Sequence, residues 1–301
     1  MDPRGPRRYD PAMRVHLLDG TYELFRAHFG APGRTAPTGE EIGAVHGLMS
    51  STLRLLQDEG VTHLGAAFDS EVLSFRNELF PPYKTDEGMP PELLAQFPWA
   101  EEALEALGVV VWRMIDFEAD DALAAAAWKY SDQVEQVVSL SPDKDMAQCV
   151  VGDNPVCFDR RKRAFMNEQG VWDKFGVAPE SIPDYLGLMG DSSDGIPGIP
   201  AWGAKSSATV LARYGHIDYI PLDAADWDVQ VRGAERLAAS LREHRDDALL
   251  YRHLATVRRD VPIAETVADL EWKGVPRGRF HGFCERWGFT NLRNRPRRWA
   301  G

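Results

Sequence analysis

Residues 109–130 read VVVWRMIDFEADDALAAAAWKY, and this stretch decides the predicted fold. It opens with an apolar run over residues 109–114, which predicts a buried strand. The Ala-rich segment 119–130 predicts a helix, and residues 134–140 (VEQVVSL) predict another strand. A strand, a helix and a strand in this order are typical of two parallel strands joined by a crossover helix, so the sequence indicates an α/β fold.

The same alternation extends toward the N-terminus. Residues 15–18 and 63–68 predict two more buried strands, while residues 40–58 and 91–107 predict helices. We therefore expect a parallel sheet flanked by helices over residues 13–175. Beyond residue 175 the strand signal fades, and an all-α second part is expected over residues 176–290. Its predicted helices lie near residues 180–189, 204–214, 232–256 and 277–287.

The chain has 46 acidic and 34 basic residues, which gives a formal net charge of −12. This balance argues against a protein that coats nucleic acid through a general basic surface, and it is compatible with carboxylates gathered around cations. The three cysteines form no CxxC pair, which argues against a zinc cluster or a disulfide framework and favours the reducing cytoplasm. No apolar stretch reaches the length of a membrane helix, so no membrane partner is expected.

Three polar segments stand outside this pattern. Residues 1–12 (MDPRGPRRYDPA) predict a disordered tail, and residues 291–301 predict a basic tail. The Pro- and Gly-rich segment 80–91 interrupts the elements and favours a loop or a mobile arch near residues 80–105. Residues 160–163 (RRKR) predict the solvated tip of a β-hairpin, with contact to a DNA backbone as the alternative.

Acidic side chains follow each predicted strand of the sheet. Because the carboxyl ends of parallel strands meet at one edge of a sheet, four acidic groups distant in sequence are expected to converge there. Any one of them could instead form a turn or cap a helix. Converging carboxylates repel one another, and an oxygen-only donor set suits two Mg²⁺ or Mn²⁺ ions. These residues are Asp19, Asp69, Glu118, Asp120, Asp121, Asp143 and Asp145.

A second signature covers residues 190–206, which read GDSSDGIPGIPAWGAKS. Asp191 and Asp194 are candidates to join the acidic group. The glycines predict a hairpin whose backbone N–H groups can approach a phosphate, and Lys205 adds a positive charge at the start of the next helix. An ordinary helix–turn–helix corner with glycine caps is the alternative.

These motifs occur together in one order and spacing. They comprise Asp19-Gly20, Phe68-Asp69, Ser74-Phe75-Arg76, Tyr83-Lys84, Glu118-x-Asp120-Asp121, Asp143-Lys144-Asp145 and Gly190-Asp191-x-x-Asp194-x-x-Pro197-Gly198. From about residue 15 to residue 214 the chain resembles the bacterial 5′-3′ exonuclease and flap endonuclease family, which includes the N-terminal nuclease domain of DNA polymerase I. The resemblance implies a PIN-like α/β core followed by a helix–hairpin–helix part of the helix-3-turn-helix type.

The resemblance also implies roles for individual residues. Asp19, Asp69, Glu118 and Asp120, supported by Asp121, would hold one metal ion. Asp143, Asp145, Asp191 and Asp194 would hold a second, and Lys84 would act on the scissile phosphate. Together with Lys84, Asp143 and Asp145 form the predicted catalytic group. The hairpin is expected to take a monovalent cation such as K⁺. The expected DNA-binding residues are Phe25, which would stack on a terminal base, and Arg76, Tyr83, Gly198, Ile199, Trp202, Gly203, Lys205 and Ser206.

The sequence departs from the family pattern at two places. The family commonly has Tyr-Lys-x-x-Arg, whereas Tyr83-Lys84 is followed by Thr85, Asp86 and Glu87, so the second cation is missing. The hairpin usually reads Gly-Ile-Gly, and here it reads Ala201-Trp202-Gly203.

The resulting prediction is a monomeric, structure-specific 5′-nuclease that hydrolyses DNA at 5′ ends or flaps with two metal ions, in replication or repair. Two alternatives remain open. One is a PIN-like ribonuclease, and the other is a catalytically weak protein that binds DNA structures.

Overall fold

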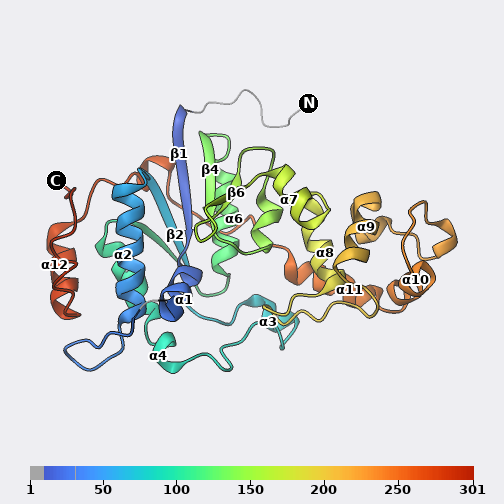
Figure 1. The fold of residues 1–301 in the computed structure, drawn as a ribbon, viewed down its shortest axis with the longest axis horizontal. Coiled ribbons are helices and arrows are strands. Elements are labelled where there is room, and N and C mark those ends of the chain that lie inside the picture. The colour runs from blue at the N-terminus through green and yellow to red at the C-terminus, as the bar shows by residue number, and fades with distance from the viewer. Residues whose placement is uncertain (1–9, 31) are drawn as a thin grey trace. The chain divides into compact units, whose positions relative to one another are not determined.

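A computed structural model describes residues 10–30 and 32–301 of the chain (Figure 1). The chain forms two compact units. Unit 1 comprises residues up to Val72, Asp86–Ser141 and Arg259–Gly301, and unit 2 comprises Leu73–Thr85 and Pro142–Arg258. The expected division of the sequence near residues 175 and 290 stays a prediction.

Unit 1 contains four parallel strands in the order β3-β2-β1-β4. They are β1 (Asp10–Asp19), β2 (His63–Asp69), β3 (Val110–Met114) and β4 (Val134–Leu140). The predicted parallel sheet is therefore confirmed. β1 begins at Asp10, five residues before the expected start, so residues 10–12 belong to the strand and not to a tail. Residues 1–9 of the expected tail lie outside the described residues.

Helices cover both faces of this sheet. The alanines of α6 (Ala119–Tyr130) are buried against it, and Figure 1 shows α6 on the opposite side of β1 from α2 (Gly43–Asp58). The predicted helices near residues 40–58 and 119–130 are confirmed as α2 and α6. The predicted helix at residues 91–107 forms α4 (Pro91–Leu94) and α5 (Phe97–Ala106), and the one near residues 277–287 is α12 (Arg277–Arg286). α1 (Gly20–Gly30) was not predicted from the sequence, because Gly20 at its start resembles a turn residue.

Unit 2 is helical apart from one hairpin. β5 (Val156–Asp159) and β6 (Ala164–Met166) pair antiparallel, which confirms a hairpin at residues 160–163. The helices are α3 (Phe75–Leu79), α7 (Glu168–Phe175), α8 (Ile182–Met189), α9 (Ala204–Tyr214), α10 (Ala234–Glu243) and α11 (Arg245–Ala255).

One predicted helix of unit 2 is interrupted. Residues 232–256 form α10 and α11, because His244 between them adopts φ −111° and ψ 28°, outside the helical region. Its Nδ1 lies 3.2 Å from Asp247 Oδ2 in the first turn of α11. Among the described residues, no helix combines the length and apolar composition that crossing a lipid bilayer requires.

Candidate metal centre and nucleic-acid interface

Two carboxylates of unit 1 lie at the carboxyl ends of neighbouring strands. Asp19 ends β1 and Asp69 ends β2, and both are buried. Asp19 Oδ1 accepts a hydrogen bond from Tyr22 N (2.8 Å), and its Oδ2 accepts one from Ser141 Oγ (2.8 Å). Gly20 is required beside Asp19, because an added Cβ would lie 2.4 Å from the Phe68 ring. The strand ends thus hold these acids where the sequence predicted them.

The first turn of α6 carries the remaining acids of unit 1. Ala119 N donates to Asp69 Oδ1 (2.9 Å), which brings Asp69 to the start of this helix. Glu118 N donates to Asp121 Oδ2 (3.0 Å), and both side chains are buried while Asp120 is half-buried. The helix N-terminus favours negative charge at all of these positions. We call Asp19, Asp69, Glu118, Asp120 and Asp121 the first carboxylate group.

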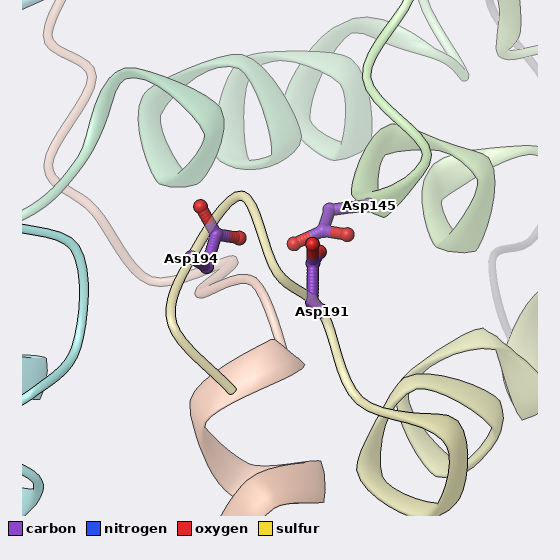
Figure 2. Close-up of side chains that lie close together, drawn as sticks. All are labelled: Asp145, Asp191 and Asp194. Carbon is purple, nitrogen blue, oxygen red and sulfur yellow. The ribbon is translucent and has the colours of Figure 1, made fainter. Parts of the chain in front are cut away.

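Three carboxylates of unit 2 face one another directly. Asp145 follows β4 at the start of a 3₁₀ helix (Asp145–Cys149), while Asp191 and Asp194 lie on the loop after α8. Each offers an oxygen within 4.8 Å of an oxygen from the other two, and Figure 2 shows these side chains pointing toward a common point. Asp143 is coupled to them because Asp145 N donates to Asp143 Oδ1 (2.9 Å). We call Asp143, Asp145, Asp191 and Asp194 the second carboxylate group.

Lys144 and Ser193 belong to this site, and the sequence analysis gave neither a role. Lys144 Nζ lies 2.5 Å from Asp191 Oδ2 and donates to Ser193 Oγ (3.0 Å). Ser193 donates from its backbone N and its Oγ to Asp191 Oδ1. Burial opposes the charge of Lys144, but the hydrogen bond that its ammonium donates to Asp191 and the charges of the neighbouring carboxylates raise its pKa. The signal in the sequence that could have predicted a role for Lys144 is its position between Asp143 and Asp145.

The environment of Asp145 fits a cation. Burial, followed by the charges of Asp143, Asp194 and Asp191, raises the pKa of Asp145 well above its usual range. Its Oδ1 is buried and has no hydrogen-bond donor among the described residues. Buried carboxylate oxygens require a donor or a cation, and an all-oxygen set suits a hard divalent ion. The second carboxylate group therefore has the donors and the unbalanced charge of a metal site.

Lys84 is fixed next to this group within unit 2. Its backbone N donates to Asp194 O (3.0 Å), and its carbonyl accepts from Asn77 Nδ2 of α3 (3.3 Å). A Cβ on Gly195 would lie 2.6 Å from Pro82 O, so the two loops are in close contact. The backbone of the predicted catalytic lysine is thus attached to the loop that carries Asp191 and Asp194.

Arg76 and Tyr83 were expected to bind DNA, but both side chains are buried, 2% and 3% exposed respectively. The Arg76 guanidinium donates to Leu254 O (2.8 Å) and Thr256 O (2.9 Å) at the end of α11. It also lies over the rings of Phe75 and Tyr83. This burial favours a structural role for Arg76 and Tyr83 over the expected contact with DNA. The sequence could not reveal it, because the partners of Arg76 lie about 180 residues away.

The predicted phosphate-binding hairpin precedes α9. Gly198 has φ +69°, and a Cβ there would lie 2.5 Å from Gly190 N, so only glycine fits. Ile199 and Trp202 are buried, and Trp202 Nε1 donates to Leu237 O (3.1 Å). These two side chains therefore hold the hairpin in place, and their backbone N–H groups donate within the protein, Ile199 N to Leu188 O (3.0 Å) and Trp202 N to Ile199 O (3.4 Å). The expected DNA contact at Ile199 and Trp202 stays a prediction.

The start of α9 is open to a ligand. Gly203 N donates to Ser206 Oγ (3.0 Å), which caps the helix, and Lys205 is exposed. A Cβ on Gly203 would meet no atom within 4 Å. Phe25 lies in unit 1, where it is half-buried on α1 with its ring 6.0 Å from that of Phe97. The stacking role of Phe25 stays a prediction.

The chain matches two protein-family descriptions in succession. Residues 14–176 match the 5′-3′ exonuclease N-terminal resolvase-like domain, and residues 177–277 match the 5′-3′ exonuclease C-terminal SAM fold. DNA polymerase I of Bacillus caldotenax is 33% identical over 285 residues, which is 93% of this chain and 32% of that protein. The chain thus spans about a third of the length of the curated relatives that it matches.

Two solved structures share the fold. A bacteriophage T5 5′-exonuclease with bound zinc ions aligns with a TM-score of 0.64 at 18% identity, covering 81% of this chain and 89% of that one. The catalytic core of Rad2 in complex with a DNA substrate aligns with a TM-score of 0.59 at 12% identity, covering 91% and 86%.

Proposed function

This chain belongs to the 5′-3′ exonuclease family, and on that premise we propose that it is a divalent-metal-dependent nuclease that hydrolyses DNA at 5′ ends or flaps. One observation carries the proposal. Asp145, Asp191 and Asp194 converge within 4.8 Å, with a buried carboxylate oxygen that lacks a donor among the described residues. Such a group is strained without a cation and stable with one.

The proposed ligands of one Mg²⁺ ion are the oxygens of Asp145, Asp191 and Asp194, with Asp143 supporting Asp145. The first carboxylate group of unit 1 would hold a second Mg²⁺. Bound Mg²⁺ or Mn²⁺ would lower the pKa of a water molecule and stabilise charge on the leaving 3′-oxygen. Backbone N–H groups hold four of these carboxylates in place, those of Asp19, Asp69, Asp143 and Asp191.

Lys84 would contribute a positive charge at the scissile phosphate. A lysine ammonium is a compact charge on a flexible stem, and a rigid backbone anchor limits the volume that it searches. The hydrogen bonds from Lys84 N to Asp194 O and from Asn77 Nδ2 to Lys84 O provide that anchor. Transition-state charge on the phosphate oxygens would therefore be neutralised by a group already positioned in unit 2.

The hairpin and the start of α9 would hold the DNA backbone. Exposed N–H groups at a helix N-terminus together with Lys205 suit a phosphate, and carbonyls of the hairpin would take K⁺. The T5 relative was solved with divalent metal ions and the Rad2 core with DNA, which supports metal and DNA as the ligands proposed here. The similarity to proteins named DNA polymerase I supports a role in replication or repair.

A labelled 5′-flap DNA and a single-stranded RNA of the same length test the proposal together. We expect cleavage of the DNA with Mg²⁺ or Mn²⁺, and none in excess chelator. Ca²⁺ is expected to bind without supporting turnover, because it tolerates looser coordination. Cleavage of the RNA alone would favour the PIN-like ribonuclease, and binding to the flap without cleavage would favour a non-catalytic DNA-binding protein.

A further inference from the structure

The tip of the β5–β6 hairpin carries four consecutive cations. Asp159 pairs with Ala164, so the loop consists of residues 160–163, all of them Arg or Lys. Asp159 Oδ1 accepts hydrogen bonds from Arg161 N and Lys162 N (2.9 Å each), which fixes the turn. Arg161, Lys162 and Arg163 are exposed, and neither Arg161 nor Arg163 makes an ion pair with any described residue. The proposed metal and hairpin sites do not use these side chains.

The turn has an unfavourable composition for a hairpin of its shape. Arg163 has φ 54°, the left-handed region where Gly or Asn is preferred. Adjacent like charges also repel one another. A solvated turn gains nothing from either feature, whereas a polyanion bound at the tip would relieve the repulsion.

The cations continue from the tip toward α9. Lys174 lies in the last turn of α7 and is exposed. α7 packs against β6, because a Cβ on Gly170 would lie 3.2 Å from Met166 Cγ. Burial of the Lys174 amine, and next the positive charge of Lys162, lower the pKa of Lys174. α7 ends at Gly176, where an added Cβ would lie 3.3 Å from Ala208 Cβ of α9. Lys205 precedes Ala208 by three residues, on the same side of α9.

We propose that Arg161, Lys162, Arg163, Lys174 and Lys205, here called the basic strip, form an extended binding site for the phosphates of duplex DNA. The inference rests on the proposed function, because Lys205 belongs to the hairpin module assigned to DNA. Charge complementarity selects the ligand. In a chain of net charge −12, a polyanion is repelled by the excess of acidic residues, and a group of exposed cations provides a place where it can bind.

The strip acts through charge and not through base recognition. Arginine and lysine at an exposed hairpin tip contact phosphates without reading sequence, so affinity depends on salt and not on the base composition of the duplex. Each phosphate contact contributes about 0.9 units to the slope of log K against log salt concentration.

The test measures binding of a 5′-flap duplex to the full chain in chelator, across a salt series. The test variant carries Arg161→Gln, Lys162→Gln and Arg163→Asn, because Asn tolerates the left-handed conformation. We expect the salt slope to fall by about two to three units, and affinity at low salt to weaken at least about tenfold. Lys174→Gln alone is expected to lower the slope by about one unit.

A matched control removes three exposed cations of unit 1, through Lys273→Gln, Arg293→Gln and Arg295→Gln. Its salt slope is expected to match that of the parent protein.

Two failures are distinguishable. If the parent protein binds and cleaves the flap and the tip variant has the same salt slope, the proposal of the basic strip is wrong and the proposed function stands. An equal loss of slope in the control would also overturn it, because total charge would then be the cause. A parent protein that neither binds nor cleaves DNA would overturn both.

Discussion

The two carboxylate groups differ in how their charges are balanced. In unit 1, Asp19 and Asp69 accept hydrogen bonds from Tyr22 N, Ser141 Oγ and Ala119 N, at strand ends and a helix N-terminus. In unit 2, Asp145, Asp191 and Asp194 face one another, and Lys144 supplies the nearest positive charge. Backbone and hydroxyl donors therefore serve Asp19 and Asp69 in unit 1, whereas in unit 2 Lys144 and Ser193 serve Asp191, and Asp145 Oδ1 has no donor among the described residues.

The difference has a thermodynamic consequence. Hydrogen bonds from backbone N–H groups stabilise the charged form of a carboxylate, whereas burial among like charges destabilises it. We therefore expect the metal-free protein to be destabilised locally in unit 2, and a bound divalent ion to stabilise unit 2 more than unit 1. Substitutions that remove one charge from each group test this difference.

The largest effect is expected from Asp145→Asn compared with Asp69→Asn. Both changes remove a proposed metal ligand, so each should lower the single-turnover cleavage rate at least about 1,000-fold. Their effects on the metal-free protein should have opposite signs. Asp145→Asn removes repulsion and should stabilise unit 2 by about 1 kcal/mol. Asp69→Asn removes a charge from the N-terminus of α6 and should destabilise unit 1 by about 0.5 to 1 kcal/mol.

Thermal unfolding in chelator measures these stabilities, and cleavage of a labelled flap in Mg²⁺ measures the rates. Binding of the flap in chelator serves as the control for folding, since both variants should retain it. Stability changes of the same sign in the two variants would contradict the contrast between the groups. Retention of most of the cleavage rate by Asp145→Asn would contradict its assignment as a ligand.

Much of this arrangement could be predicted from the sequence. Apolar runs bounded by Asp19, Asp69 and Asp143 predicted strands of a parallel sheet, because strand burial and strand ends are written in local composition. The placement of Asp145, Asp191 and Asp194 together required a resemblance to a family, since these residues are separated by a hairpin and two helices.

What could not be predicted depends on contacts between distant segments. Arg76 resembled a DNA ligand, but its guanidinium is buried against carbonyls at the end of α11. Lys144 received no role from the sequence, but folding brings it against Asp191. Whether a charged side chain is exposed is decided by its tertiary neighbours, and a single sequence does not report them.

Acidification should affect the two units in opposite directions. Burial, and next the charge of Arg14, lower the pKa of His16 in β1 to about 4. Between about pH 6.5 and 4 the unfolded chain then binds more protons at His16, so unit 1 loses up to about 3 kcal/mol as pH falls. The raised pKa of Asp145 has the opposite sign, because the folded state binds the proton first, and unit 2 gains stability as pH falls from neutral in chelator.

Denaturant-dependent hydrogen exchange, followed on peptides of β1 and of residues 145–149, reads the two units separately. His16→Gln should remove the pH dependence of the stability measured on the β1 peptide. Asp145→Asn should remove the pH dependence of the stability measured on the peptide of residues 145–149. Saturating Mg²⁺ should also suppress the second, because a bound cation keeps the carboxylates charged. If the stability of both peptides fell with pH in chelator, the two carboxylate groups would not differ in how their charges are balanced.

Lys144→Gln tests whether a protein cation and a metal ion compete for the second carboxylate group. Without Lys144, Asp191 loses its ion pair, so the metal-free protein should be less stable. The uncompensated charge should bind a divalent ion about tenfold more tightly. Titration calorimetry with Mn²⁺ checks the affinity, and Lys273→Gln on the exposed surface of unit 1 is the control. Weaker Mn²⁺ binding by Lys144→Gln would mean that Lys144 organises the ligands instead of competing with the ion.

The smallest effect concerns backbone strain, in which the units also differ. Both non-glycine residues that the described part of the chain holds at positive φ lie in unit 2, Arg163 at 54° and Ala201 at 72°. Ala201 occupies the hairpin position where the family has glycine. The left-handed region costs an L-residue about 1–2 kcal/mol, and replacing it with glycine removes this cost. The larger conformational entropy of glycine in the unfolded chain offsets part of that stabilisation. Ala201→Gly should therefore stabilise unit 2 by about 0.5 to 1 kcal/mol and leave unit 1 unchanged.

Gly198→Ala is the reverse exchange on the same hairpin, and it should destabilise unit 2 strongly because its Cβ would lie 2.5 Å from Gly190 N. Hydrogen exchange on peptides of α9 and α2 measures the two units. A loss of stability with Ala201→Gly would show that the methyl group of Ala201 packs usefully enough to outweigh its strain.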